Sequence, residues 1–461
     1  MGKSVKIYLP TVRGGVNLLF KLSGVKVRHL KNTARLAPKR IPVPKRVYIP
    51  MAMHIGAPAT LTVSRGDTVK VGTLIGDGGM GLSSHVYSSV SGTVVKIDEI
   101  ISIAGKHVPT VVIESDGEQT LDENIAPYEV NTKEEFLEAL RKSGIVGLGG
   151  AGFPTPIKLN VDNTRVDTLI VNGAECEPYI TSDTRTMLDN ADDVAYGISL
   201  IKKFLEIDRV ILGIEKNKPE CIRAMRNATR NMEGVSIKAL PSIYPHGGEK
   251  VIAYHTTGRV VPQGGLPIDI GLIVVNCTTV ATIAKFIRTG MPLVEKCVTV
   301  DGSAVKEPQN LIAPIGMPVG ELIEHCGGFR EEPRKILYGG PMMGIALADP
   351  ASPILKQTNA VIFMGESEAT PPPVTPCIKC GACINACPFS LDPVAISKAH
   401  KANEPEMLQK LRVDLCMECG CCSYVCPAKR NIVQRNKMAK TMLREYQLKM
   451  KSAGGNANGR A

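Results

Sequence analysis

The sequence predicts a multidomain α/β protein that ends in a small helical domain built around cysteines. A length of 461 residues is too great for one average domain. Strand-like and helix-like segments alternate between residues 126 and 292, which is typical of a parallel sheet with helices on its faces. Eight of the 14 cysteines fall into two matching runs between residues 377 and 426. This spacing indicates a metal or redox domain rather than a disulfide framework.

The chain carries a net charge of +11, and the positive charge is concentrated at its two ends. Residues 1–47 form a basic arm punctuated by prolines, and residues 431–461 form a basic helix followed by a flexible tail. Such ends can contact nucleic acid, anionic lipid or acidic proteins. Tryptophan is absent and other aromatic residues are few, which gives no support for base stacking. We therefore expect no nucleic-acid partner.

Residues 48–125 predict a small all-β domain, because β-branched residues and glycines dominate this stretch. It resembles the barrel-sandwich fold of biotinyl and lipoyl domains, in which GDxVxxG precedes a hairpin. A carrier domain places a lysine at the tip of that hairpin. Residues 83–92 contain no lysine, so we expect a structural role rather than a swinging arm.

Residues 126–292 begin with a helix whose capping box is formed by Thr132 and Glu135. The strand-like segments that follow are VDTLIVNG, RVILGI, VSIKAL and GLIVVN, with helical segments between them. Ligands of such folds bind beyond the carboxyl ends of the strands. A short β-rich domain with one helix follows at residues 293–350. Residues 351–376 are a connecting segment with a proline-rich linker.

Two cysteine runs, CIKCGACINACP and CMECGCCSYVCP, define a domain over residues 377–430. Their spacing is that of bacterial ferredoxins with two [4Fe–4S] clusters, in which three cysteines of a run bind one cluster and the fourth binds the other. The first cluster is assigned to Cys377, Cys380, Cys383 and Cys426. The second cluster is assigned to Cys416, Cys419, Cys422 and Cys387. Zinc is the competing interpretation, but zinc ribbons use pairs of CxxC knuckles.

The segment VGLGGAGFPT, at residues 146–155, is a candidate ligand-binding loop. Glycines let backbone N–H groups approach a ligand closely and tolerate positive φ angles, which suits a phosphate or a flat ring. The loop has neither the Rossmann GxGxxG nor the Walker GK[ST] sequence, and a purely structural turn is the alternative. The glycines concerned are Gly147, Gly149, Gly150 and Gly152.

Polar residues follow this loop, most of them at predicted strand ends. They are Lys158, then Asn172, Glu175 and Glu177 in NGAECEP, Gly248 and Glu249 in YPHGGEK, and Asn276 in VVNCTT. Asn and Glu at successive strand ends suit the hydroxyls of a ribityl chain or of a nicotinamide ribose. A flavin accepts a hydride from NADH and releases electrons one at a time, which iron–sulfur clusters cannot do. The sequence therefore predicts a flavin upstream of the clusters.

These motifs resemble two related families. GLGGAGFPTPIKL and NGAECEP are similar to the flavin and NADH loops of the flavoprotein subunit of respiratory complex I. The longer series, HIGAP, GGAGFPT, ECEPY, YPHGGEK, CGGF, YGGPMMG and the paired ferredoxin motifs, resembles the C subunit of the Rnf ion-translocating electron transport complex, an NADH:ferredoxin oxidoreductase. The resemblance implies a barrel-sandwich β unit, a Rossmann-like FMN/NADH domain, a β-grasp domain of the SLBB type, and a helical ferredoxin-like domain with two [4Fe–4S] clusters.

The resemblance also implies residue roles. The residues that would contact FMN are Gly147, Gly149, Gly150, Lys158 and Asn172. Phe153 would stack on the adenine of NADH, and Glu177 would bind the nicotinamide nucleotide. Glu249 and Asn276 would complete the site, and no side chain would act as a catalytic acid or base, since hydride transfer depends mainly on position.

As a member of the Rnf family the protein would be a peripheral subunit on the cytoplasmic face of the cell membrane. It would pass electrons from NADH through FMN and the two clusters toward ferredoxin, while other subunits translocate Na⁺ or H⁺. Implied partners include the ferredoxin-like B subunit and the D and G subunits of the membrane part.

Two alternatives stay open. A cobalamin reductase of a propanediol-type microcompartment shares the flavin loop and both clusters, although its domains follow a different order. A non-catalytic electron conduit with an empty nucleotide site is the other. The sequence departs from the complex I pattern at Leu148, Ala174, Lys250 and Cys277, and the last three of these suggest the conduit.

Overall fold

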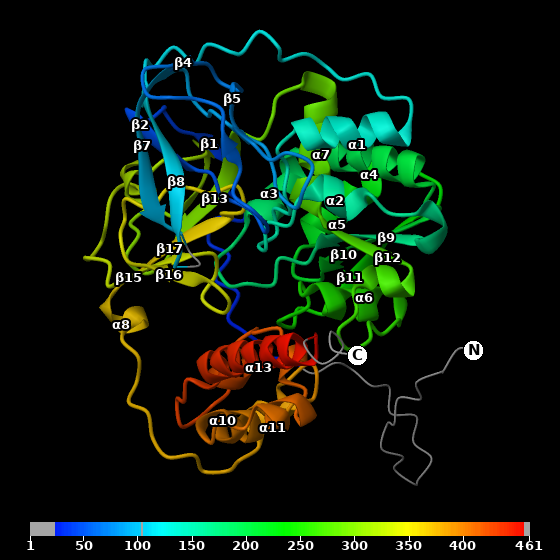
Figure 1. Cartoon of the computed structure of the whole chain (residues 1–461), viewed down its shortest axis with the longest axis vertical. Helices are drawn as coiled ribbons and strands as arrows, with labels where there is room; N and C mark the ends of the chain where they lie inside the picture. The colour runs from blue at the N-terminus through cyan, green and yellow to red at the C-terminus, as the bar shows by residue number, and fades with distance from the viewer. Residues whose placement is uncertain (1–23, 103–104, 456–461) are drawn as a thin grey trace.

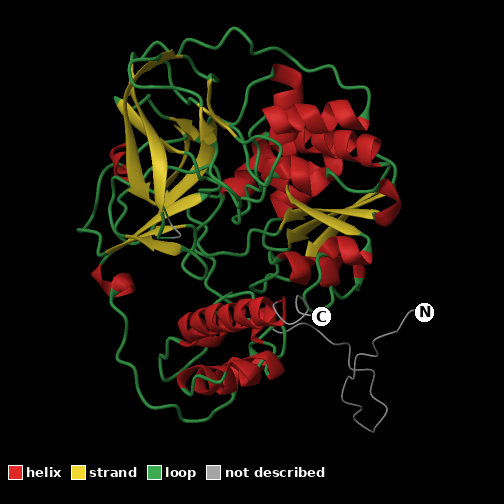
Figure 2. Ribbon diagram, in the orientation of Figure 1, coloured by secondary structure: helices red, strands yellow, loops and turns green. Residues whose placement is uncertain are grey.

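The computed structural model describes residues 24–102 and 105–455 and folds them into two sheet-bearing lobes above a helical domain (Figure 1). One lobe combines the N-terminal β domain with a six-stranded sheet, and the other is a parallel sheet covered by helices (Figure 2). The first 23 residues of the predicted basic arm and the last six of the predicted tail lie outside the described residues. None of the described helices is long and apolar enough to cross a membrane.

The N-terminal β domain consists of short strands in two antiparallel sheets, ordered β2-β8-β7-β4 and β3-β5-β6. The strands are β2 (Arg46–Pro50), β3 (Thr60–Leu61), β4 (Thr68–Val69), β5 (Leu74–Asp77), β6 (Val86–Tyr87), β7 (Gly92–Ile101) and β8 (His107–Ser115). At the start of β7, Gly92 has a φ of +151°, and a Cβ there would lie 2.0 Å from the carbonyl oxygen of Glu114. Only glycine allows this close approach of the two strands. The two sheets agree with the predicted barrel-sandwich fold.

The second lobe is a four-stranded parallel sheet in the order β11-β10-β9-β12. Its strands are β9 (Thr168–Gly173), β10 (Arg209–Glu215), β11 (Val235–Leu240) and β12 (Leu272–Asn276). Its helices are α1 (Lys133–Lys142), α2 (Thr155–Leu159), α3 (Ser182–Asp189), α4 (Ala191–Leu205), α5 (Pro219–Ala228), α6 (Glu249–Thr257) and α7 (Cys277–Thr289), with short 3₁₀ helices at η1 (Asn163–Arg165) and η2 (Pro267–Ile270). The predicted capping box of Thr132 and Glu135 is present at the start of α1. The alternation predicted from the sequence is confirmed.

The third sheet differs from the expected domain boundaries. Its order is β1-β14-β13-β17-β15-β16, and the segment expected over residues 293–350 supplies only four of these strands. Those four are β13 (Glu295–Asp301), β14 (Gln309–Pro314), β15 (Lys335–Tyr338) and β16 (Ile345–Leu347), with the 3₁₀ helix η3 (Val319–Cys326). The fully buried β17 (Ala360–Met364) comes from the expected connecting segment and lies between β13 and β15. A five-residue apolar run does not reveal its sheet partners, because pairing depends on residues far away in the chain.

The helical domain carries the two cysteine runs in equivalent surroundings. Its helices are α9 (Ala382–Asn385), α10 (Pro393–Lys401), α11 (Pro405–Lys410), α12 (Cys421–Tyr424) and α13 (Ile432–Gly455), with η4 (Val413–Leu415). In each run a glycine with positive φ, Gly381 or Gly420, precedes a one-turn helix. The long α13 packs on α10 and α11 through Ala439 and Leu443. The predicted basic helix is therefore part of this domain, and the short α8 (Glu366–Ala369) precedes the linker to it.

The described part of the basic arm crosses between the domains. Val25 exchanges backbone hydrogen bonds with Tyr244 of the parallel-sheet lobe at 2.8 and 2.9 Å. Further along, β1 (Lys39–Arg40) adds a parallel strand to β14. This segment therefore joins the two lobes, and the side chain of one of its basic residues, Lys31, is largely enclosed between them.

Candidate active site

The glycine loop lies between α1 and α2 and is closed at its base by backbone pairing. The N–H of Gly147 donates to the carbonyl of Phe153 at 2.8 Å, and Val146 pairs with Pro154. At its tip Gly149 and Gly150 are exposed, and Gly150 has a φ of +144°. The loop therefore presents backbone rather than side chains to the surface of the site.

The carboxyl ends of β9 and β12 bring two asparagines beside this loop. Asn172 and Asn276 are register partners on the neighbouring strands. A Cβ on Gly149 would lie 3.2 Å from the Asn276 side chain, so the absence of a side chain leaves a space between loop and strand end. The N–H of Leu148 donates to Thr279 Oγ1 in α7 at 2.9 Å, which fixes the loop against the sheet.

Lys158 and Glu249, both predicted as site residues, form an ion pair. The distance from Lys158 Nζ to Glu249 Oε1 is 2.6 Å, and both side chains are about one-third exposed. Asn172 Nδ2 donates to the carbonyl of Gly247 at 2.9 Å, next to Gly248. The structure thus brings α2, the end of β9 and the start of α6 together at one edge of the sheet.

Glu175 has a different environment from the one expected. Its Oε1 accepts hydrogen bonds from the N–H groups of Asp183 and Thr184 at 2.6 and 3.3 Å, and its Oε2 accepts one from Thr184 Oγ1 at 2.5 Å. The side chain is 3% exposed. Both oxygens therefore bind groups at the start of α3, so Glu175 has a structural role inside the protein as well as the predicted role in the site.

Glu177 accepts hydrogen bonds from the N–H groups of Met342 and Met343 at 3.1 and 2.8 Å. These residues belong to the YGGPMMG turn of the six-stranded sheet. Burial raises the pKa of Glu177 to about 7. The residue expected at the nucleotide therefore also joins the two lobes.

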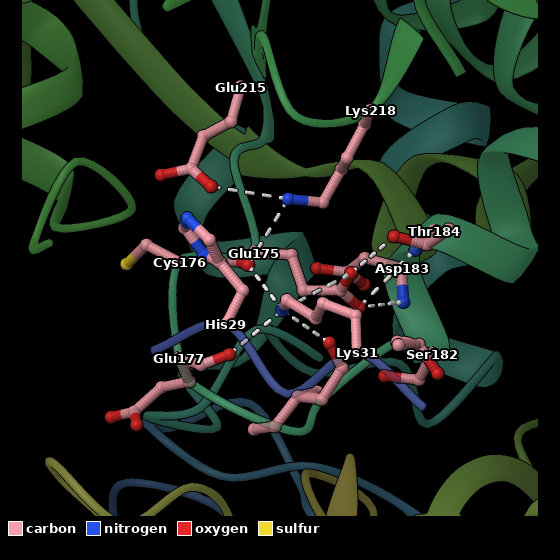
Figure 3. A network of polar contacts seen from close by, with 12 residues as sticks. His29, Lys31, Glu175, Cys176, Glu177, Ser182, Asp183, Thr184, Glu215 and Lys218 are labelled. Atoms are coloured by element: carbon pink, nitrogen blue, oxygen red, sulfur yellow. Dashed lines mark hydrogen bonds and ion pairs between the residues drawn. The ribbon is translucent and has the colours of Figure 1, made fainter. Parts of the chain in front are cut away.

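Two lysines that the sequence analysis missed hold the NGAECEP loop from opposite sides (Figure 3). Lys31 Nζ, from the arm, donates to the carbonyls of Glu175 and Glu177, both at 2.8 Å, and of Ile180 at 2.5 Å. Lys218 Nζ donates to the carbonyl of Ala174 at 2.6 Å and pairs with the buried Glu215 at 3.3 Å. No local sequence signal marks Lys31, because its partners lie about 145 residues away.

The residues at this edge fit a flavin mononucleotide. Exposed backbone at a glycine turn, a lysine and two strand-end asparagines supply donors for a phosphate and for ribityl hydroxyls. The space beside Gly149, which a Cβ would narrow, lies between the loop and Asn276. The chemistry of these groups suits FMN, and their individual roles as ligands stay a prediction.

The second set of cysteines encloses a cavity in the helical domain. The cavity is lined by all four predicted ligands, Cys387, Cys416, Cys419 and Cys422, together with apolar side chains and Asn436. Cys421 also lines it, although it lies outside the ferredoxin spacing. The residues of the second cluster are therefore brought together as predicted, across the two runs.

The first set is partly enclosed. Cys383 and Cys426 share a buried cluster with Ala428 and Ile432, whereas Cys377 and Cys380 are exposed. Backbone contact holds the exposed segment near them, since the N–H of residue 375 donates to the carbonyl of residue 428 at 3.1 Å. In the described part of the chain no three His, Cys, Asp or Glu side chains converge as ligands of one metal ion. Cluster thiolates bind separate irons, so such convergence is not required of them.

The side of the helical domain that carries the second set faces the parallel-sheet lobe. Tyr244 Oη donates to the carbonyl of Cys419 at 2.8 Å. Met417 packs so closely on Gly248 that a Cβ there would lie 2.4 Å from its terminal methyl. The cavity of the second set is thus next to the YPHGGEK segment, and the exposed Cys377 and Cys380 belong to the other set.

Four family models match the chain in order. They describe an RnfC barrel sandwich hybrid domain (residues 20–118), a Nuo51 FMN-binding domain (140–285), an SLBB domain (297–346) and a 4Fe-4S dicluster domain (373–432). Together they confirm the predicted fold class and the order of its parts.

Curated relatives resemble the chain over most of its length. The C subunit of the proton-translocating ferredoxin:NAD(+) oxidoreductase complex of Clostridium ljungdahlii is 41% identical over 80% of this chain and 81% of its own. The Na(+)-translocating counterpart of Acetobacterium woodii is 40% identical over 78% and 82%. The C subunit of the ion-translocating oxidoreductase complex of Rhodobacter capsulatus is 38% identical over 95% and 84%. A solved NAD+-reducing [NiFe]-hydrogenase superposes only loosely, with a TM-score of 0.48 at 18% identity over 68% of this chain and 63% of that chain.

Proposed function

This chain belongs to the RnfC family, the C subunits of Rnf-type ferredoxin:NAD⁺ oxidoreductase complexes, and from that premise we propose that it is the NADH-oxidising subunit of such a complex. It passes electrons from NADH through FMN and two [4Fe–4S] clusters toward ferredoxin. The observation that carries the proposal is one polypeptide with a glycine loop at the end of a parallel sheet and a four-cysteine cavity packed against the same lobe.

The residues at the sheet edge are assigned to binding. Lys158 would bind the phosphate of FMN, and its pair with Glu249 holds the ammonium at the sheet edge. Asn172 and Asn276 would bind the ribityl chain, and the glycine loop would contact the ring. Phe153, which is partly exposed, is assigned to the adenine of NADH.

Bound FMN supplies the chemistry that converts a hydride into single electrons. The chain itself supplies position, since hydride transfer requires the two rings to be held in contact and correctly oriented. The loop is therefore required to be rigid. Its own hydrogen bonds, the contact to Thr279 and the lysines behind NGAECEP provide this rigidity.

The packing of the helical domain suggests a direction through the cysteine sets. The set of Cys387, Cys416, Cys419 and Cys422 lies beside the nucleotide lobe, so we assign it to the entry side. Cys377 and Cys380 are exposed, which suits the exit side, where a partner must approach. Other subunits of the complex, including an iron–sulfur subunit and membrane subunits, are the proposed partners. The proposed location is peripheral, on the cytoplasmic face of the cell membrane.

The test is an anaerobic titration of the chain, reconstituted with iron, sulfide and FMN, with NADH. We expect the flavin and the cluster absorbance to bleach together. Gly149→Val, which fills the space beside Asn276, should lose FMN and keep its clusters. Gly81→Val is the matched control, because a Cβ on this exposed glycine would meet no atom within 4 Å. If dithionite bleaches the clusters of the wild type and NADH does not, the chain is an electron conduit and the proposal fails.

A further inference from the structure

Lys356 is a buried lysine that the proposed function does not use. It lies in the segment between β16 and β17 and is 1% exposed. Its Nζ donates to the carbonyl of Gly144 at 2.8 Å, to Ser84 Oγ at 3.2 Å and to the carbonyl of His85. All three partners are neutral, so the ammonium has hydrogen bonds and no counter-charge.

The groups around Lys356 do not supply this counter-charge. Burial lowers the pKa of His54 to about 4 and also lowers that of His85, so both rings are neutral. Asp77 lies beside His85, whose Nδ1 is 3.2 Å from Asp77 Oδ1, and contributes nothing to the pKa of Lys356, for which burial is the one cause. Arg141 and Glu138, which face the same ring from α1, pair with each other at 3.4 Å. Burial alone lowers the pKa of Lys356 to about 7. An unpaired buried charge is costly and requires an explanation.

The position of Lys356 relative to the glycine loop suggests an explanation for its unpaired charge. Gly144, whose carbonyl accepts a hydrogen bond from Lys356, lies two residues before the glycine loop. The next residue, Gln357, approaches the other end of the loop, where a Cβ on Gly152 would lie 3.7 Å from the Gln357 Cδ. The N–H of Ile55, in HIGAP, donates to the carbonyl of Gly152 at 3.0 Å. The barrel-sandwich domain and Gln357 therefore contact the loop at Gly152, and Lys356 binds the chain at Gly144, just before the loop begins.

Polar groups beside the loop also lack partners. His54 Nδ1 and Gln357 Oε1 are buried without a hydrogen-bond partner among the described residues. His54 Nε2 lies 2.9 Å from the carbonyl oxygen of Ala57, which can only accept a hydrogen bond, so the proton of the neutral ring is on Nε2 and Nδ1 is an acceptor. Two buried acceptors without partners next to one loop, a ring nitrogen and an amide oxygen, are consistent with a site that a ligand completes.

We propose that Lys356 is a positioning residue of the flavin site whose ammonium, behind the glycine loop, stabilises the negative charge that reduction places on the flavin ring. This rests on the proposed function. A hydride carries two electrons and one proton from NADH, which leaves as NAD⁺, so the reduced ring gains one negative charge. A fixed positive charge nearby favours that form over the oxidised, neutral ring. Lys158 is assigned to the phosphate, whose charge is present in both states.

The experiment compares the affinity of each variant for oxidised and reduced FMN and measures the midpoint potential of the bound flavin. Loss of the Lys356 charge should weaken binding of reduced FMN about tenfold more than binding of oxidised FMN. This difference lowers the two-electron midpoint potential of the bound flavin by about 30 mV. We expect this for Lys356→Met and not for Lys356→Arg. Lys142→Met is the matched control, because Lys142 lies two residues before Gly144 and its side chain is 53% exposed.

If Lys356→Met weakens the binding of oxidised and reduced FMN equally and leaves the midpoint potential unchanged, the proposal is overturned. Such a result would indicate contact with the phosphate or a purely structural role. A wild-type chain that binds no FMN would refute the proposed function instead. A measurement on the wild type covers the case in which Lys356→Met does not fold. Because burial lowers the pKa of Lys356 to about 7, this side chain is a neutral amine above pH 7 in the oxidised chain, and it must take up a proton on reduction to stabilise the ring. The potential should then fall by about 60 mV per pH unit above pH 7, whereas uptake of the hydride's proton alone gives about 30 mV. A slope of about 30 mV throughout would overturn the proposal.

Discussion

Replacing Lys31 with methionine removes the group that holds the NGAECEP loop from the side of the arm. The ammonium donates to three backbone carbonyls between residues 175 and 180, and its side chain is 14% exposed. Methionine has a similar length and no donor. The loop should therefore open more often, although the parallel sheet beneath it stays intact.

Two opposing terms set the size of this effect. A buried carbonyl left without a donor costs about 1–3 kcal/mol, so three cost about 3–9 kcal/mol. Burial lowers the pKa of Lys31 from 10.5 to about 8, so keeping the ammonium in the fold costs about 3 kcal/mol, which methionine avoids. The carbonyl term exceeds this cost over nearly all of its range, and the expected net loss is about 3 kcal/mol.

Hydrogen exchange followed by mass spectrometry measures this loss locally. A loss of about 3 kcal/mol accelerates amide exchange in residues 174–180 by roughly 100-fold, and affinity for FMN should fall with it. Lys45→Met is the control, since Lys45 is exposed in the same arm, and its exchange should match the wild type. Unchanged protection of residues 174–180 in Lys31→Met would refute the reasoning, as would equal acceleration in both variants.

The remaining predictions concern the carboxylate between the lobes, the cysteine sets and the phosphate site. Burial raises the pKa of Glu177 from 4.5 to about 7, so the folded chain binds more protons than the unfolded chain between these values, and its stability falls as pH rises across this window. In denaturant titrations between these pH values, Glu177→Gln should reduce the pH-dependent loss of unfolding free energy by up to roughly 3 kcal/mol. The same dependence of unfolding free energy on pH in the variant and the wild type would contradict this prediction. Cys419→Ser should lower the iron content by about four per chain, whereas Cys421→Ser should keep it, and equal losses would count against the assigned ligands. Lys158→Gln should lower the affinity for FMN about tenfold and leave the affinity for riboflavin, which lacks the phosphate, unchanged. The variant should lose little stability, because the partly exposed ion pair with Glu249 contributes at most about 1 kcal/mol. An equal loss of affinity for both ligands would exclude a phosphate contact.

Features that depend on local sequence were predictable. The capping box of Thr132 and Glu135, the four parallel strands and the cysteine spacing each follow from periodicity or from residues a few positions apart. The ferredoxin spacing also predicts that Cys387 binds the same cluster as three cysteines of the second run. The cavity lined by these four cysteines agrees with that assignment.

Features that depend on contacts between distant segments were not predictable. Glu175 follows a strand end as a ligand residue would, but positive φ at this residue and the nearby N–H groups of α3 direct it into the protein. The sheet position of β17 and the role of Lys31 depend on partners more than 50 residues away. A single sequence shows which residues are present, but it does not show which distant residues contact each other.

The contacts behind the glycine loop explain why the domains occur on one chain. A loop made largely of glycine gains ligand access and loses rigidity, since glycine has the greatest conformational freedom to give up on folding. Part of the order comes from outside the parallel-sheet lobe. Lys31 of the arm holds the neighbouring NGAECEP loop, Ile55 of the barrel sandwich donates to Gly152 of the glycine loop, and Lys356 of the six-stranded sheet segment donates to Gly144 just before that loop. A lobe excised at residues 126–292 would keep every glycine and lose all three contacts. The barrel sandwich, without a carrier lysine, therefore has a function in this chain as a support for the loop.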